Sequence, residues 1–150
     1  MLDVAGPAAT TPPMQEMLGR TRAFLTNQIE ASGLVRYHGS PDAPTIGALG
    51  CLITPDSDDT ALVWRVAPGA NRALLTKALE TIRRFRRADG LYQTWLARRA
   101  DYRCLDPGHD PNPADIGIQM HILMLLARED PPTAKALCQA TWAGFRIGHR

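Results

Sequence analysis

Long apolar runs, lysine and cysteine are all scarce in this chain of 150 residues. The longest uninterrupted apolar run, residues 122–127, is far shorter than the roughly 20 residues that a membrane-spanning helix needs. The N-terminus lacks the basic and apolar regions of a signal peptide. Two lysines stand beside 15 arginines, and the net charge of +2 indicates neither a nucleic-acid nor a membrane-surface partner. We therefore expect a cytoplasmic protein with no integral membrane segment.

The three cysteines, Cys51, Cys104 and Cys138, have spacings that fit no metal site, and they cannot all be paired with one another. Free thiols in a cytosolic protein are the simplest interpretation. Cys138 stands among alanine and leucine residues, which favours a place in the apolar core. The cysteines therefore give no reason to expect a metal centre.

Helical periodicity dominates the sequence, and no segment shows the alternation that is typical of a β-strand. Residues 1–13 are small and proline-rich, which predicts a disordered leader ahead of a single helical domain over residues 14–150. Five helices are expected: one from Met14 to the Ser32-Gly33 pair, and others over 60–66, 71–87, 114–128 and 133–142. Long loops over 33–57 and 100–113 separate them. The sequence thus predicts an all-α fold of stacked helical hairpins.

Two of these helices differ in how they should be buried. The helix over 71–87 carries one apolar stripe and polar residues elsewhere, which is typical of a helix with one face on the core. The helix over 114–128 is apolar almost all round, so we expect it to be buried on most sides.

Three carboxylates, Asp56, Asp58 and Asp59, crowd into four positions between Pro55 and an apolar helical run. Like charges this close disfavour simultaneous ionisation, so the cluster should retain one proton. Three interpretations are open. Asp58 or Asp59 can cap the helix that follows, a protonated carboxyl can act as an acid catalyst, or the carboxylates can hold a cation such as Mg²⁺.

Four segments together resemble the terpenoid cyclase and protein prenyltransferase-like α/α toroid family, over about residues 33–140. They are Gly-Leu-Val-Arg-Tyr at 33–37, Pro-Asp-Ser-Asp-Asp-Thr-Ala-Leu at 55–62, Asp-Gly-Leu-Tyr-Gln-Thr-Trp at 89–95 and, more weakly, Asp-Ile-Gly-Ile-Gln-Met-His-Ile-Leu at 115–123. The second segment is similar to the D-x-D-D-T-A motif of squalene-hopene-type, class II cyclases. The resemblance implies a partial α/α toroid, because complete members of the family are about twice as long.

The resemblance also implies roles for the acidic residues. Asp58 matches the middle carboxyl, which donates the proton in catalytic relatives, and Asp56 and Asp59 match the residues that flank it. Protonating an alkene needs a carboxylic acid whose conjugate base is stabilised by neighbouring donors, inside an apolar chamber that excludes water. No cofactor is implied, and Mg²⁺ is expected only if the substrate is a diphosphate.

Four further residues are candidates for binding substrate. Trp95 and Tyr92 either pack between helix pairs or face a cationic intermediate. Gln119 and His121 stand where relatives often have asparagines, and His121 can equally be a hydrogen-bonded core residue. Asp115 can bond to Gln119 one turn later or serve the first turn of its own helix.

Two functions follow as expectations. In the first, Asp58 protonates an isoprenoid in a chamber where the acidic cluster meets Gln119–His121, and a second copy or another chain closes the ring. In the second, the chain is a non-catalytic helical interaction module that retains the toroid fold. Half a ring leaves an unpaired helical edge with apolar surface, which predicts association.

Overall fold

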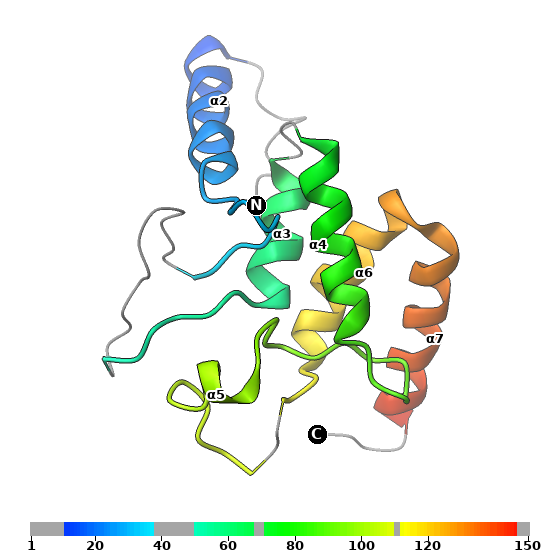
Figure 1. Cartoon of the computed structure of the whole chain (residues 1–150). Helices are drawn as coiled ribbons and strands as arrows, with labels where there is room; N and C mark the ends of the chain where they lie inside the picture. The colour runs from blue at the N-terminus through cyan, green and yellow to red at the C-terminus, as the bar shows by residue number, and fades with distance from the viewer. Residues whose placement is uncertain (1–10, 38–49, 68–70, 110–111, 147–150) are drawn as a thin grey trace.

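The computed structural model describes residues 11–37, 50–67, 71–109 and 112–146, and these residues contain helices but no strand. The helices are α2 (Pro12–Thr26), α3 (Ser57–Val66), α4 (Arg72–Arg84), α5 (Arg99–Tyr102), α6 (Ile116–Glu129) and α7 (Pro131–Arg146) (Figure 1). The predicted all-α class is therefore confirmed. None of these helices has both the length and the apolar character that crossing a membrane would require.

The core lies between α3, α4, α6 and α7, which gather in the middle of the molecule, whereas α2 projects at one end (Figure 1). Helix α6 packs against α3 on one side and α7 on the other. Trp64 of α3, Ile82 of α4, Ile122 and Leu125 of α6 and Leu137 of α7 are almost completely buried. Only Leu18 of α2 is buried, so this helix contributes little to the core.

Helix α4 forms where its stripe predicts and ends slightly earlier. Asn71 caps it, because its Oδ1 accepts hydrogen bonds from the backbone N–H groups of Ala73 and Leu74 at 3.1 and 3.4 Å. The predicted end at Arg87 is wrong, since the helix stops at Arg84. The following N–H groups bond to carbonyls three residues back, which tightens the chain into the turn that leads to residues 91–96.

Helix α2 begins earlier and ends earlier than predicted. It starts at Pro12, where proline suits the first turn, so Pro12 and Pro13 are helical although the prediction placed them in a disordered leader. Residues 1–10 of that leader, and 38–49 of the predicted loop, lie outside the described residues. The helix ends at Thr26, and Gly33 then adopts a φ of +83° beside α4. A Cβ there would lie 2.1 Å from the carbonyl oxygen of Leu74, so only glycine permits this close approach.

The prediction that the helix around 114–128 is buried on most sides is wrong. Helix α6 buries one face and exposes Ile116, Met120 and Met124 on another. Cys138 of α7 is exposed beside that face, although its neighbours in the sequence suggested a core position. Apolar composition alone could not reveal that, in the described part of the chain, α3 and α7 are the helices that pack most closely against α6 and leave one of its faces uncovered.

Two of the three cysteines are not free thiols, which corrects the sequence interpretation. Cys51 and Cys104 form a disulfide with a Cα–Cα separation of 5.7 Å, across 53 residues of sequence. It ties the segment before α3 to Cys104, which lies two residues after the short helix α5, and α5 overlaps the start of the predicted loop over 100–113. Structural disulfides persist mainly in oxidising compartments. The expected cytoplasmic location rested partly on three free thiols, so it loses that support.

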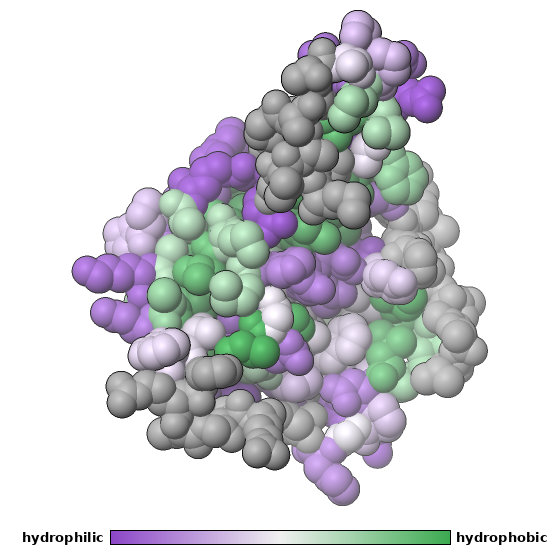
Figure 2. Space-filling view, turned by 180° about the vertical axis from the view of Figure 1, so that it is seen from behind, coloured by the Kyte–Doolittle hydropathy of each residue, from purple (hydrophilic) through white to green (hydrophobic). Residues whose placement is uncertain are grey.

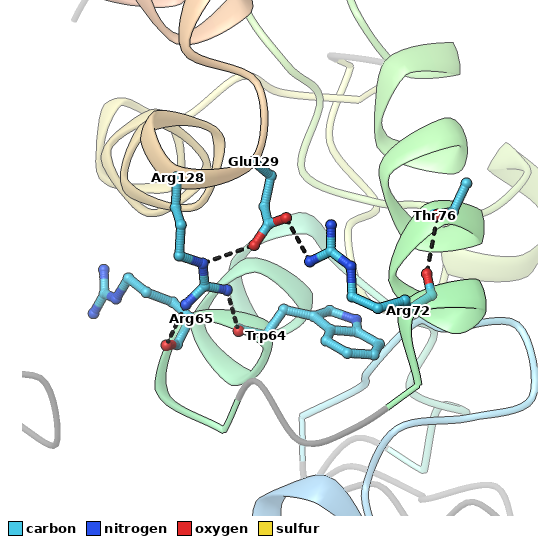
Figure 3. A network of polar contacts seen from close by, with 6 residues as sticks. All are labelled: Trp64, Arg65, Arg72, Thr76, Arg128 and Glu129. Atoms are coloured by element: carbon cyan, nitrogen blue, oxygen red, sulfur yellow. Dashed lines mark hydrogen bonds and ion pairs between the residues drawn. The ribbon is translucent and has the colours of Figure 1, made fainter.

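A polar network joins α3, α4 and α6 at one end of the core (Figure 3). Arg128 donates to the backbone carbonyls of Trp64 and Arg65 at 2.9 and 3.3 Å, which caps the C-terminal end of α3. Glu129 accepts from Arg128 at 2.7 Å and from Arg72 at 2.8 Å. Burial alone would raise the pKa of Glu129, but these two guanidinium groups outweigh it and lower the pKa.

Candidate functional site

The four segments that carry the family resemblance meet in space and are hydrogen-bonded to one another. We use the name belt for residues 33–37, 55–60, 91–96 and 112–119, which overlap these four segments and add the neighbouring Leu96, Asn112, Pro113 and Ala114. The backbone N–H of Asp56 donates to Val35 O at 3.3 Å, that of Ser57 donates to Thr94 O at 2.8 Å, and that of Thr94 donates to Pro113 O at 2.8 Å. Much of the belt is irregular backbone among packed helices, so its polar groups need these partners.

Two hydroxyl groups of the acidic segment complete the belt. The Thr60 Oγ1 accepts from the N–H of Val35 at 3.0 Å, and the Ser57 hydroxyl donates to Gln93 O at 2.6 Å. Both side chains are completely buried. Ser57 and Thr60 therefore link α3 to two other belt segments, which is a structural use of two motif residues.

Gln119 and Tyr92, two predicted substrate-binding residues, bond to each other inside the belt. The Gln119 Oε1 accepts from the N–H of Tyr92 at 2.7 Å, and its Nε2 donates to Tyr92 O at 2.7 Å. Both residues are completely buried. Gln119 Nε2 also donates to the backbone oxygen of Asp115, whose own side chain caps α6 at the N–H of Gly117. The side-chain amide of Gln119 thus pairs with both backbone polar groups of Tyr92, as a neighbouring β-strand would.

Asn112 has the same role for Trp95, and the sequence analysis missed it. Its Oδ1 accepts from the N–H of Trp95 at 2.9 Å, and its Nδ2 donates to Trp95 O at 2.8 Å. An asparagine between two prolines, Pro111 and Pro113, was the available signal, because a polar residue in such a rigid segment often bonds to nearby backbone.

Asp56 caps α3, which corrects the prediction that Asp58 or Asp59 does so. The helix begins at Ser57, three residues before the predicted Thr60, so the cap position moves back to Asp56. Its Oδ1 accepts from the backbone N–H of Asp59 at 2.7 Å. Only 8% of Asp56 is exposed, so the cap also carries a buried carboxyl.

The proton that the acidic cluster should retain belongs to Asp56. Burial raises the pKa of Asp56 to about 8, the negative charge of Asp59 adds to the rise, and the bond from the Asp59 N–H opposes it. The carboxyl groups of Asp56 and Asp59 are also hydrogen-bonded to each other, and this raises the pKa of Asp56 further. The catalytic assignment from the sequence placed the acidic proton on Asp58 instead.

Asp58 faces α6, where it meets His121. The Oδ1 of Asp58 lies 2.8 Å from the Nδ1 of His121. Both atoms are buried and neither makes a hydrogen bond within the described residues, so the two atoms are close without forming an aligned hydrogen bond. The side chains as a whole are 45% and 32% exposed. The structure thus brings together the predicted acid and one predicted substrate-binding residue, at a partly open position.

Two hollows lie near α6 and α7, and neither includes Asp56, Asp58 or Asp59. The first, which we call the end pocket, has a volume of about 920 Å³ and lies where α6 begins and α7 ends. Trp95 lines it, together with Asp106 and Asp115. The second, which we call the groove, has a volume of about 270 Å³ and runs between α6 and α7. Of the predicted site residues, these hollows contain only Trp95.

The described part of the chain contains no group of three histidine, cysteine, aspartate or glutamate side chains placed to hold a metal ion. Asp56 bonds to backbone and to Asp59, whereas Asp58 turns toward His121. The carboxylates of Asp56 and Asp59 are therefore bonded to each other, whereas that of Asp58 has a different neighbour.

The chain matches no family model, no curated protein and no solved structure. The resemblance to terpenoid cyclases consequently stays a prediction from the four motifs.

The buried carboxyl of Asp56 predicts a distinctive pH dependence of stability. The folded chain keeps this proton up to about pH 8, whereas the unfolded chain loses it near pH 3.8. Stability must therefore fall as pH rises through this window, by up to about 1.4 kcal/mol per pH unit. Asp56→Asn removes the titration but keeps a good cap. In urea denaturation from pH 5 to pH 9, we expect the stability difference, wild type minus variant, to decline up to about pH 8 and then level off.

Asp101→Asn is the matched control, because Asp101 is exposed and its bond to Arg98 lowers its pKa. The stability difference between wild type and Asp101→Asn should show no slope over the same range, because both proteins keep Asp56. A wild-type stability that runs parallel to that of Asp56→Asn would contradict a proton held at this position.

Proposed function

We propose that this chain is a terpenoid-cyclase-like helical module that associates with a second copy of itself and performs no chemistry alone. The observation that carries the proposal is the exposed apolar face of α6 and α7, formed by Ile116, Met120, Leu123, Met124, Cys138 and Trp142. Apolar side chains gather on the side of the molecule where α6 and α7 lie (Figure 2).

The belt supports a module that keeps the family's packing without its chemistry. Ser57, Thr60, Gln119 and Tyr92 are all used to join backbone segments. Asp56 is used to cap α3. These motif residues are therefore explained by folding alone, with no need for a substrate.

The shape and charge of the α6–α7 face favour a second copy as the partner. Trp142 is 63% exposed and stands beside the groove, so a two-fold pairing can place the Trp142 of each copy in the groove of the other. Two-fold pairing also brings identical residues near each other. Charged side chains close to the two-fold axis would therefore repel their copies and weaken the dimer. Among the described residues, those that line the groove include no carboxylate, lysine or arginine.

Sedimentation velocity over a range of concentrations tests this association. We expect wild-type protein to form dimers as concentration rises, and Trp142→Glu to stay monomeric because it places a charge at the centre of the face. Phe24→Glu is the matched control, since Phe24 of α2 is also 63% exposed but lies on another helix. Wild-type protein that stays monomeric up to millimolar concentration, or equal disruption by both variants, would contradict the proposal.

The contact between Asp58 and His121 favours a second candidate, in which Asp58 is a general acid. His121 Nδ1 lies 2.8 Å from Asp58 Oδ1, so a protonated imidazole there would stabilise the carboxylate that remains after Asp58 gives up a proton. The Asp58 side chain is 45% exposed. A chamber would then have to be completed by the second copy, because neither hollow extends to the acidic cluster.

Incubation with squalene and with geranylgeranyl diphosphate separates the two candidates. The non-catalytic module should yield no cyclised product at any protein concentration, with wild type or with Asp58→Asn. A product that the wild type forms and folded Asp58→Asn does not would overturn the non-catalytic proposal in favour of the acid. Circular dichroism of both proteins establishes that the variant is folded.

A further inference from the structure

The end pocket has no role in the proposed association or in the acidic cluster. We infer that it binds a small organic cation with an apolar body. The inference rests on the walls, charges and helix ends of this pocket, and it does not depend on the proposed function.

The pocket has the size and lining of a ligand site. Its volume of about 920 Å³ lies within the range of about 300–1,000 Å³ that is usual for small-molecule pockets. Leu91, Leu105 and Ile118 contribute apolar walls from three separate segments. Thr141 adds a hydroxyl that is buried and has no hydrogen-bond partner among the described residues. A ligand with a hydrocarbon part and a polar atom would satisfy both kinds of wall.

The charges around the pocket favour a cation. Arg87, the positive residue of the lining, is already paired with Asp89 at 3.1 Å. Asp106 and Asp115 instead accept hydrogen bonds from neutral donors, the Trp95 indole N–H at 3.2 Å and the Gly117 N–H at 2.7 Å. Arg99 bonds to the backbone oxygen of Asp106 at 2.6 Å and not to its carboxylate. Among the described residues, the carboxylates of Asp106 and Asp115 therefore have no side-chain cation as a hydrogen-bond partner.

The helix ends point to the same conclusion. The positive end of α6 would attract an anion, but the carboxylate of Asp115 already caps it. The end of α7 contributes Thr141 and Gly144 to the lining. The last carbonyl groups of a helix lack partners within the helix and carry partial negative charge, which favours a cation there.

Trp95 is held rigidly at this site and offers an aromatic surface. Its backbone is fixed by Asn112, its indole N–H by Asp106, and its ring stacks on Tyr102 with centroids 5.7 Å apart. The ring of a tryptophan attracts cations within about 6 Å of its centroid. A ring that is already ordered loses little conformational entropy when a ligand binds. Two carboxylates beside a fixed indole are a suitable arrangement for an alkylammonium group.

Isothermal titration with three matched probes tests the inference: hexyltrimethylammonium, hexanol and hexanoate. We expect the cation to bind about tenfold more tightly than the neutral alcohol, and the anion to bind most weakly. Asp106→Asn and Asp115→Asn remove charge while keeping an acceptor oxygen, and each should weaken binding of the cation about tenfold. Asp101→Asn, a neutralisation outside the pocket, should leave the affinity unchanged.

Several results would overturn the inference. They are a cation that does not bind at millimolar concentration, a neutral or anionic probe that binds as tightly as the cation, and unchanged affinity in the Asp106→Asn, Asp115→Asn double variant. Trp142→Glu distinguishes this site from the proposed association. A monomeric Trp142→Glu protein should bind the cation as the wild type does, and loss of binding in that monomer would contradict a pocket that one chain completes.

Discussion

The structure depends on one constraint, which is that the irregular backbone of the belt must find hydrogen-bond partners among packed helices. Tyr92 is completely buried, and both of its backbone polar groups bond to the amide of Gln119 at 2.7 Å. An unpaired buried N–H or C=O costs about 1–3 kcal/mol, so a segment of this kind is stable only with dedicated partners. Gln119, Asn112, Ser57 and Thr60 supply these partners. These polar side chains thus fix the positions of the belt segments, and of the helices that adjoin them, relative to one another.

The same constraint places the carboxylates of the acidic cluster in different surroundings. The belt draws the start of α3 into the interior, which buries Asp56 and raises its pKa. Asp58 lies on the other side of the same turn, where it meets His121 and stays partly open to solvent. The carboxyls of Asp56 and Asp59 are thus bonded to each other, whereas Asp58 has a separate environment. The motif as a whole needs no single role.

Sequence patterns predicted the helices and the grouping of the motifs better than they predicted burial. The stripe of α4 depends on local spacing, and the structure has it where expected, whereas Gly33 lies beyond the end of α2 and does not terminate that helix as predicted. The exposed side of α6 depends on which helices pack against it, and the Cys51–Cys104 disulfide joins positions 53 residues apart. The cap at Asp56 was missed because the belt extends α3 by one turn at its start. Tertiary contacts decide all three features, so local sequence could not reveal them.

Native-state hydrogen exchange is the most direct test of the belt as one cooperative unit. The backbone N–H groups of Val35, Tyr92 and Thr94 each bond to another belt segment, and Ala78 lies inside α4 as a reference for global unfolding. We expect the three belt amides to exchange with the same free energy as Ala78, because they open only when the core unfolds. Belt amides that exchange much faster than Ala78, or that differ widely from one another, would contradict a belt on which the fold depends.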